Sequence, residues 1–137
     1  LLQRFVLTSF YYQLGGPQWQ SQESWLTYDN ECSWNGIECN EGGEVIVIDM
    51  DNNNLTGEIP ANLLLLSKLQ TFSTAQNSLS GEIPSNLFNL TDLTILDLSA
   101  NLLSGQLPSE VGVASNITDL RLSANSLGGT LPTEIGL

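Results

Sequence analysis

One segment recurs four times in this 137-residue chain, and each copy starts 24 residues after the one before. The first copy reads IDMDNNNLTGEIP from Ile48, and the later copies start at Phe72, Leu96 and Leu120. A fixed period of roughly 20–30 residues with apolar residues at set places predicts a solenoid, in which each repeat stacks on its neighbours. Three further columns keep the same period: Asn53, Asn77, Asn101 and Asn125; Gly57, Gly81, Gly105 and Gly129; and Pro60, Pro84, Pro108 and Pro132.

Each repeat begins with the pattern of a short strand. Apolar residues alternate at Leu96 and Leu98, so one face of the strand is expected to be buried. The asparagine that follows is predicted to turn the chain, because its amide can both donate to and accept from unpaired backbone groups. We therefore assign a structural role to all four asparagines. The proline and the apolar residue three positions after it indicate a short helical or 3₁₀ return.

Thr74 is a departure from the repeat pattern. Apolar residues occupy its column in the other repeats, at Met50, Leu98 and Leu122. Its hydroxyl therefore either bonds a backbone carbonyl or leaves the second coil slightly underpacked.

The predicted division of the chain is a capping region over residues 1–44, followed by about four repeats over residues 45–137, the last truncated. Four apolar residues spaced four apart indicate an amphipathic helix over residues 1–14: Leu2, Val6, Phe10 and Leu14. All three Trp and all three Tyr lie within the first 34 residues. These rings either form a stacking platform for sugars or bases, or cover the open end of the first coil, and the second interpretation is favoured. The turn at Gly42 and Gly43 predicts a hairpin that leads into the first repeat strand.

The chain has two cysteines, Cys32 and Cys39, and no histidine. Two cysteines alone cannot form a closed zinc site, and their spacing differs from that of a C-x-x-C redox pair. We therefore expect a disulfide, which contributes about 2.5 kcal/mol by the chain-entropy relation. Such a bond indicates an oxidising compartment.

The charge balance is strongly acidic, with three basic and 15 acidic side chains and a net charge of −12. Nucleic acids and anionic membrane surfaces both require Lys and Arg, so we expect neither nucleic acid nor direct membrane contact. Without histidine, no Ser-His-Asp or Cys-His catalytic set can form. We expect no enzyme activity and no cofactor in this segment, whereas a kinase domain elsewhere in a longer chain stays open.

The segment Asp49-Met50-Asp51-Asn52-Asn53 starts like a calcium-binding loop. However, Asn54 stands where that loop needs glycine, and Pro60 stands where it needs glutamate. We predict no metal site, and the strand alternation instead turns Asp49 and Asp51 to the outward face of the first strand.

Two motifs together resemble those of plant-type extracellular leucine-rich repeat proteins. One is the cap pattern C-x-W-x-G-[VI]-x-C, seen here as Cys32, Trp34, Gly36, Ile37 and Cys39. The other is the repeat body L-x-x-L-x-x-L-x-L-x-x-N-x-L-[ST]-G-x-[IL]-P. The resemblance implies a right-handed superhelix with a concave parallel β-sheet, a convex side of short 3₁₀ or helical turns, and a helical, disulfide-bonded N-terminal cap. The family includes ectodomains of receptor-like proteins and receptor kinases, and secreted inhibitors of cell-wall-degrading enzymes.

Outward strand positions are predicted to form a concave face that suits an extended peptide or a flat protein patch. Four short strands at ~4.8 Å spacing offer roughly 300 Å². A stable interface needs about 800 Å² per partner, so this face is expected to be part of a larger site. The candidate ligand contacts are Asp49, Asp51, Thr71, Ser73, Ile95, Asp97, Asp119 and Arg121.

Three N-x-T sequons, at Asn54, Asn89 and Asn116, fall where the repeat pattern places residues outside. With the expected disulfide they favour the secretory route and an extracellular or cell-surface location, although repeat composition alone also produces sequons. The chain starts at Leu1 without Met and stops within the fourth repeat. We therefore expect a piece of a longer protein, which can carry a membrane anchor.

Three functions stay open at this point. The first is an extracellular recognition module of a receptor-like protein, which binds a peptide or protein ligand on its concave face and a co-receptor as a further partner. The second is a secreted inhibitor of an extracellular cell-wall-degrading hydrolase, and the third is a structural or adhesion spacer. A downstream membrane span and kinase pattern would support the first, and a chain that ends after a cysteine-containing cap would support the second.

Overall fold

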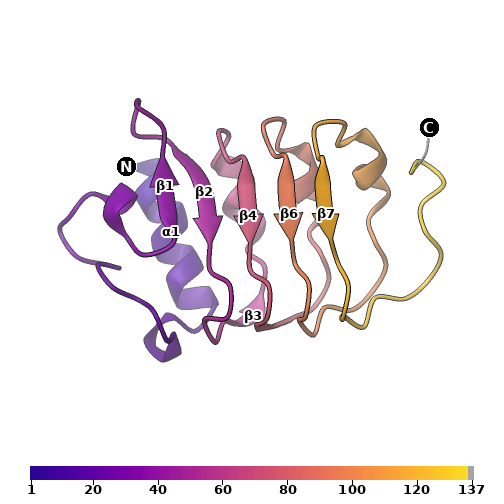
Figure 1. Cartoon of the computed structure of the whole chain (residues 1–137), viewed down its shortest axis with the longest axis horizontal. Coiled ribbons are helices and arrows are strands. Elements are labelled where there is room, and N and C mark those ends of the chain that lie inside the picture. Colours follow the sequence, from indigo (N-terminus) through magenta and orange to yellow (C-terminus); the bar gives the residue numbers. More distant parts are fainter. Residues whose placement is uncertain (136–137) are drawn as a thin grey trace.

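The computed structural model describes residues 1–135 and shows a stack of coils with one sheet along its side (Figure 1). In these residues a five-stranded sheet has the order β1-β2-β4-β6-β7. Its strands are β1 (Ile37–Cys39), β2 (Val45–Asp49), β4 (Thr71–Ser73), β6 (Ile95–Asp97) and β7 (Asp119–Arg121). β1 pairs antiparallel with β2, whereas the later pairs are parallel. The predicted hairpin and the one strand that each repeat contributes to this sheet are confirmed. Residues 136–137 of the predicted repeat region lie outside the described residues.

The repeat period places equivalent residues side by side in this sheet. Ile48 pairs with Phe72, Phe72 with Leu96, and Leu96 with Leu120. Ile48, Phe72 and Leu96 are fully buried and form a continuous apolar column, because each side chain is covered by the coils on both sides. Leu120 is only half-buried, since it belongs to the last described coil.

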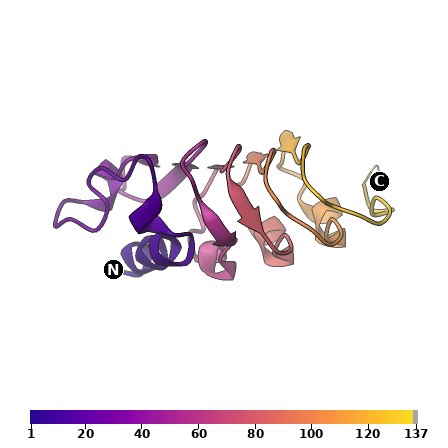
Figure 2. The same cartoon turned by 90° about the horizontal axis from the view of Figure 1, so that it is seen from below.

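Short 3₁₀ helices run along the opposite side of the stack, as Figure 2 shows. They are η3 (Ala61–Leu65), η4 (Ser85–Asn89) and η5 (Ser109–Val113). Each follows a proline of the repeat, whose fixed φ and missing N–H suit the residue that precedes a helix. A second, two-stranded parallel sheet, β3 (Thr56–Glu58) with β5 (Ser78–Ser80), forms between the main sheet and these turns.

The glycine column is required by both backbone conformation and packing. Gly81 and Gly105 have φ of +75°, where a side chain is strained. A Cβ on Gly105 would also lie 2.7 Å from Cγ of Glu82, and one on Gly81 would lie 2.8 Å from the Glu58 side chain. Glu58 and Glu82 each directly follow a glycine of this column. The residue after the glycine of one repeat therefore lies against the glycine of the next repeat.

The capping region begins with α1 (Leu2–Gln13), close to the predicted bounds. Val6, Phe10 and Leu14 are buried as predicted, but Leu2 is 56% exposed, so the buried face starts one turn later than expected. Two short 3₁₀ turns follow, η1 (Gly16–Gln18) and η2 (Glu31–Ser33). None of the helices described in residues 1–135 is long and apolar enough to cross a membrane.

The aromatic rings of the capping region form a buried cluster. Trp19, Trp25 and Trp34 are each at most 6% exposed. Trp25 lies 5.0 Å from both other Trp rings, and Phe10 lies 6.2 Å from Phe72 of the second repeat. The covering role is therefore correct for these tryptophans, since rings buried in this way present no platform to a sugar or a base.

Candidate ligand-binding face

The outward side of the five-stranded sheet is the candidate functional site. We call it the sheet face, and it faces the viewer in Figure 1. Its residues alternate with the buried core positions along each strand. The sheet face consists of Glu38, Asp49, Asp51, Thr71, Ser73, Ile95, Asp97, Asp119 and Arg121.

Strand pairing arranges the predicted contact residues in two rows. One row runs from Val47 through Thr71 and Ile95 to Asp119, and the other runs from Asp49 through Ser73 and Asp97 to Arg121. Seven of the eight predicted residues lie in these rows, and Asp51 lies two residues beyond the end of β2. The eight are not equally accessible.

Ser73 and Asp97 are less accessible than the alternation suggests. They are only 7% and 9% exposed, whereas Asp49, Asp51 and Arg121 are exposed. A strand flanked on both sides leaves a short side chain little access to solvent, and both residues are also hydrogen-bonded. The exposed side chains of the face are therefore concentrated at its two ends and at Ile95, which is 37% exposed.

Two aspartates of the face also hold the turns that follow the strands. Oδ1 of Asp51 accepts hydrogen bonds from Oγ of Ser73 and from N of Ala75, both at 2.7 Å. Oδ1 of Asp97 accepts from N of Ser99 at 3.0 Å and from its Oγ at 2.6 Å. Asp51 and Asp97 thus have a structural use in addition to any contact with a ligand.

Arg121 is bracketed by two carboxylates. Its Nε and Nη2 donate to the two oxygens of Asp119 at 3.0 and 2.7 Å, and its Nη1 lies 3.7 Å from Oδ2 of Asp97. The hydrogen bonds to Asp119 raise the pKa of Arg121, and the charges of Asp119 and Asp97 add to the increase. The only cation of the sheet face is therefore already neutralised by its own neighbours.

The opposite end of the face carries acidic groups without a paired cation. Glu38, Asp49 and Asp51 line one shallow hollow beside β1. Within residues 1–135 none of these three carboxylates forms an ion pair. Sequence reasoning missed Glu38 because β1 precedes the repeats, although the predicted hairpin already indicated an additional strand at this edge.

The sheet face as a whole is acidic. Five carboxylates and one guanidinium give it a balance of −4 at neutral pH. Nowhere in the described residues do acidic, Cys or His side chains gather in a group of three that could hold a metal ion.

The four repeat asparagines (Asn53, Asn77, Asn101 and Asn125), which we call the asparagine ladder, follow the strands of this face. Each of the last three joins its coil to the coil before it. Oδ1 of Asn101 accepts from N of Leu79 at 2.9 Å, and its Nδ2 donates to the carbonyl of Thr74 at 2.9 Å. Asn77 and Asn125 make the corresponding contacts one repeat earlier and later. Asn53 instead bonds the capping region, through N and O of Ser21. The ladder therefore holds the coils that carry the face.

The three sequon asparagines are exposed and lie off the sheet face. Nδ2 of Asn54 donates to the carbonyl of Gln18 at 2.9 Å, and Nδ2 of Asn116 donates to the carbonyl of Thr91. Asn89 and Asn116 line one hollow beside the 3₁₀ turns. Glycans at these positions would leave the sheet face open.

Comparison with known proteins agrees with this architecture. The family model for the Leucine Rich Repeat matches residues 44–66 and 92–113. A chain of the Arabidopsis receptor kinase HAESA complex with the peptide hormone IDA and the co-receptor SERK1 superposes with a TM-score of 0.88 and 30% identity. The match covers 98% of this chain and 23% of that one. This chain has the repeat pattern and the fold of plant-type leucine-rich repeat ectodomains. The predicted fold class is confirmed.

Two further relatives show how much of a larger protein this leucine-rich repeat protein matches. A chain of the BIR3–SERK2 complex from Arabidopsis thaliana has a TM-score of 0.77 and 29% identity over 96% of this chain and 74% of that one. A probable leucine-rich repeat receptor-like serine/threonine-protein kinase of Arabidopsis thaliana is 41% identical over 44 residues, which is 32% of this chain. The match spans only 6% of the length of that kinase.

Proposed function

We propose that this leucine-rich repeat protein is an extracellular recognition module that binds an extended peptide or a protein segment on its sheet face. The observation that carries the proposal is the face itself, an open sheet with a surplus of acidic side chains on a rigid stack of coils. Its similarity to a receptor kinase solved with a peptide hormone and a co-receptor supports the same function. Such a module acts at the cell surface or outside the cell, with a ligand and a co-receptor as its partners.

The charges of the face define the kind of ligand. Glu38, Asp49 and Asp51 have no cation beside them in residues 1–135, whereas Arg121 is held by Asp97 and Asp119. A partner with Lys or Arg at the β1 end is attracted, and an acidic partner is repelled. The area of roughly 300 Å² on four short strands provides only part of a stable interface. Binding therefore extends onto further repeats or a co-receptor in a full-length protein.

Peptide selection tests the location of binding. Random 12-residue peptides displayed on phage are selected against the immobilised 137-residue chain, and their affinities are measured by biolayer interferometry. Thr71→Arg places a long side chain across the centre of the face, and Ser85→Arg places the same side chain on η4 as a control. We expect Thr71→Arg to weaken binding about tenfold or more, and Ser85→Arg to change it little. Recovery of no peptide, or loss of binding only in Ser85→Arg, would contradict the proposal.

The charge preference is tested with one pair of peptides that differ only in Lys or Glu at the same positions. The double variant Glu38→Gln/Asp49→Asn should reduce the preference for the Lys peptide and its salt dependence, because exposed charges are screened by salt. Glu41→Gln/Glu110→Gln removes two acidic residues away from the face as a matched control. An unchanged preference in the first variant would show that these carboxylates do not select the ligand.

The hydrolase-inhibitor and spacer hypotheses make different predictions in the same experiments. A spacer selects no peptide that depends on Thr71. An inhibitor of a cell-wall-degrading hydrolase lowers the activity of that enzyme, whereas a peptide receptor does not.

A further inference from the structure

The first turn of α1 has little to hold it in place by its own sequence. Leu1 at the N-cap position has no polar side chain for capping, and the first turn has no acidic residue to interact with the helix dipole. Leu2 and Phe5 are 56% and 62% exposed, and burial of the helix begins only at Val6. The position of this turn must therefore depend on polar contacts to other parts of the chain.

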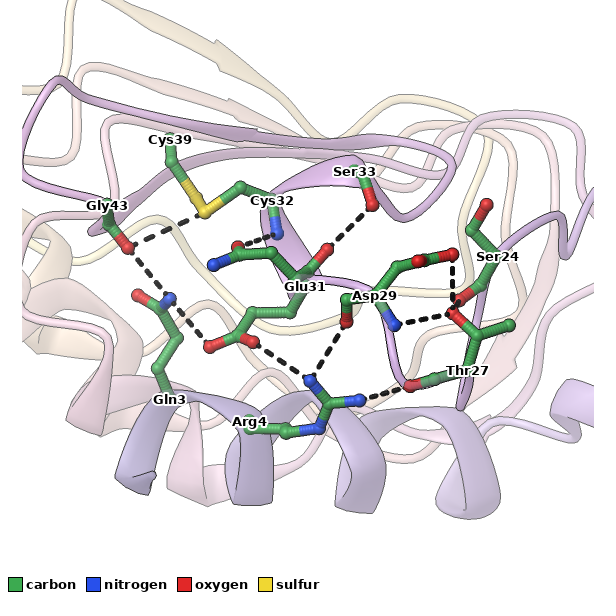
Figure 3. Close-up of polar contacts among 11 residues, drawn as sticks. Gln3, Arg4, Ser24, Thr27, Asp29, Glu31, Cys32, Ser33, Cys39 and Gly43 are labelled. Carbon is green, nitrogen blue, oxygen red and sulfur yellow. Dashed lines mark hydrogen bonds and ion pairs between the residues drawn. A yellow bond between two sulfur atoms is a disulfide. The ribbon is translucent and has the colours of Figure 1, made fainter.

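Gln3 fastens the turn to the start of the first repeat strand (Figure 3). Its Oε1 accepts a hydrogen bond from N of Val45 at 2.7 Å, and its Nε2 donates to the carbonyl of Gly43 at 3.0 Å. The same Nε2 lies 3.2 Å from Oε1 of Glu31, which accepts from it as well.

Arg4 fastens the turn to the segment that leads into η2 (Figure 3). Its Nη1 donates to the carbonyl of Asp29 at 3.0 Å and to Oε2 of Glu31 at 3.3 Å, and its Nη2 donates to the carbonyl of Thr27. The guanidinium also lies 5.0 Å from the centre of the Trp34 ring, which is within range of a cation–π interaction. The planar fork of arginine makes several of these contacts at once.

The disulfide lies directly beside the partners of Gln3 and Arg4. Cys32 of η2 is bonded to Cys39 of β1, and Sγ of Cys32 lies 3.5 Å from the carbonyl oxygen of Gly43. The segment before η2 is exposed from 26 to 30, and Ser24 and Leu26 have φ of 67° and 60°. Non-glycine residues adopt this left-handed conformation at a cost, which contacts to the rest of the capping region help to offset.

We infer that the Cys32–Cys39 disulfide is a thiol-sensitive clamp that holds the first turn of α1 through Arg4 and Gln3. A dithiol reductant supplies two electrons. The S–S bond breaks, both cysteines become thiols with two added protons, and the reductant forms its own disulfide. Glu31 and the carbonyls of Thr27 and Asp29 then move away from Arg4, and the first turn frays. The repeats stay folded, because the asparagine ladder and the apolar column use none of these contacts.

Amide hydrogen exchange of the 137-residue chain tests the clamp. The reporter is the amide of Phe5, which donates to the carbonyl of Leu1 at 3.1 Å, and the reference is the amide of Leu96 in β6. We expect complete reduction, checked by thiol alkylation and mass, to speed exchange at Phe5 about tenfold or more, because charge-assisted contacts are lost. Exchange at Leu96 should stay within about twofold. Faster exchange at both sites would show general unfolding and would overturn the inference.

Variants at Arg4 separate the clamp from a merely local effect. In the oxidised protein, Arg4→Gln should speed exchange at Phe5 nearly as much as reduction does, and Arg4→Lys should have an intermediate effect. In the reduced protein, Arg4→Gln should add almost nothing, because both changes break the same contacts. Lys68→Gln, which removes the separate ion pair to Asp92 at 3.5 Å, is the matched control. No effect of Arg4→Gln in the oxidised protein, or an equal effect in both redox states, contradicts the clamp.

Discussion

In the repeats each coil is held to the next by the same residue in the same place, whereas the capping region uses contacts that occur only once. Asn77, Asn101 and Asn125 bond neighbouring coils in one recurring pattern. In the capping region, Gln3 reaches Val45 across 42 residues, and one ring cluster covers the first coil. Because the sequence is periodic, a contact found in one repeat predicts the equivalent contact in the next repeat. The period does not predict contacts that occur only once.

The two ends of the stack differ as well. Leu96 and Leu98 are fully buried between neighbouring coils, whereas Leu120 and Leu122 in the same columns are half-buried. The capping region gives the first coil the cover that the last described coil does not have. Stability in a stack depends on the contacts between neighbours, so equivalent substitutions should cost less in the last described coil.

The largest effect is expected in the capping region, at Phe10. Its ring is fully buried and lies 5.9 Å from the ring of Trp19 and 6.2 Å from that of Phe72. Phe10→Ala should lower the free energy of unfolding by about 3–5 kcal/mol, as for other buried aromatic residues. Phe5→Ala, on the 62% exposed side of the same helix, is the control and should change it little. Urea unfolding measures both, and similar losses would mean that the ring cluster is not a core.

The asparagine ladder is expected to have the next largest effect, and its size should depend on position. Asn101→Ala should cost about 1–3 kcal/mol, because buried backbone groups lose their hydrogen-bond partner. Asn125→Ala should cost less, since Asn125 is half-buried and water can reach its partners. Ser123→Ala, at an exposed position, is the control. Equal unfolding midpoints for the two asparagine variants would contradict the position effect.

The glycine column allows conformational strain to be separated from packing. Gly43→Ala in the capping hairpin adds only strain, because φ is +78° and nothing lies within 4 Å of the new Cβ. Gly105→Ala adds the same strain and also displaces Glu82, so it should cost more than the ~1–2 kcal/mol of strain alone. Thermal unfolding should show that Glu82→Ala in the Gly105→Ala background brings the loss back toward that of Gly43→Ala. An unchanged loss would mean that Glu82 does not oppose the new side chain.

Thr74 provides a test with the opposite sign. Its Oγ1 is buried and has no hydrogen-bond partner within residues 1–135, so the predicted alternative of a bond to a backbone carbonyl is wrong. Thr74→Val keeps the shape and removes the unpaired hydroxyl, and it should raise the free energy of unfolding by about 1 kcal/mol. Thr71→Val is the control, because Thr71 is a half-buried residue of the sheet face. This substitution should change the free energy of unfolding less. A loss of stability in Thr74→Val would mean that the hydroxyl has a partner in solution.

The smallest effect concerns pH and the capping region. Burial raises the pKa of Glu31. Hydrogen bonds from its own backbone and from Gln3, together with the charge of Arg4, lower the pKa by more than burial raises it, so it lies below its ordinary value of 4.5. A carboxyl with a lowered folded-state pKa contributes stability above its unfolded pKa, and this contribution is lost as the pH falls through the folded pKa. The loss of stability between pH 7 and pH 3 should therefore be smaller in Glu31→Gln than in the control Glu41→Gln. Equal losses in urea unfolding would show that Glu31 has no such role.

The sequence by itself determined the features that depend on the period or on a unique pair. Strand positions, buried columns and the turn-forming asparagines follow from residues that return every 24 positions. The disulfide follows because Cys32 can pair only with Cys39 within this chain. These features are local, or they connect equivalent positions, so a pattern of residue types is enough to predict them.

Only the tertiary structure decided the contacts between residues that are not equivalent. Gln3 and Arg4 bond a segment 23–42 residues away, and no spacing in the sequence relates them to it. The near burial of Asp97, and the pairing of Arg121 with it, depend on how closely neighbouring strands flank a side chain. Likewise, the buried hydroxyl of Thr74 has no hydrogen-bond partner within residues 1–135, which its place in an apolar column does not reveal. Such outcomes depend on differences of a few tenths of an ångström in the distances between side chains. A pattern of residue types does not contain this information.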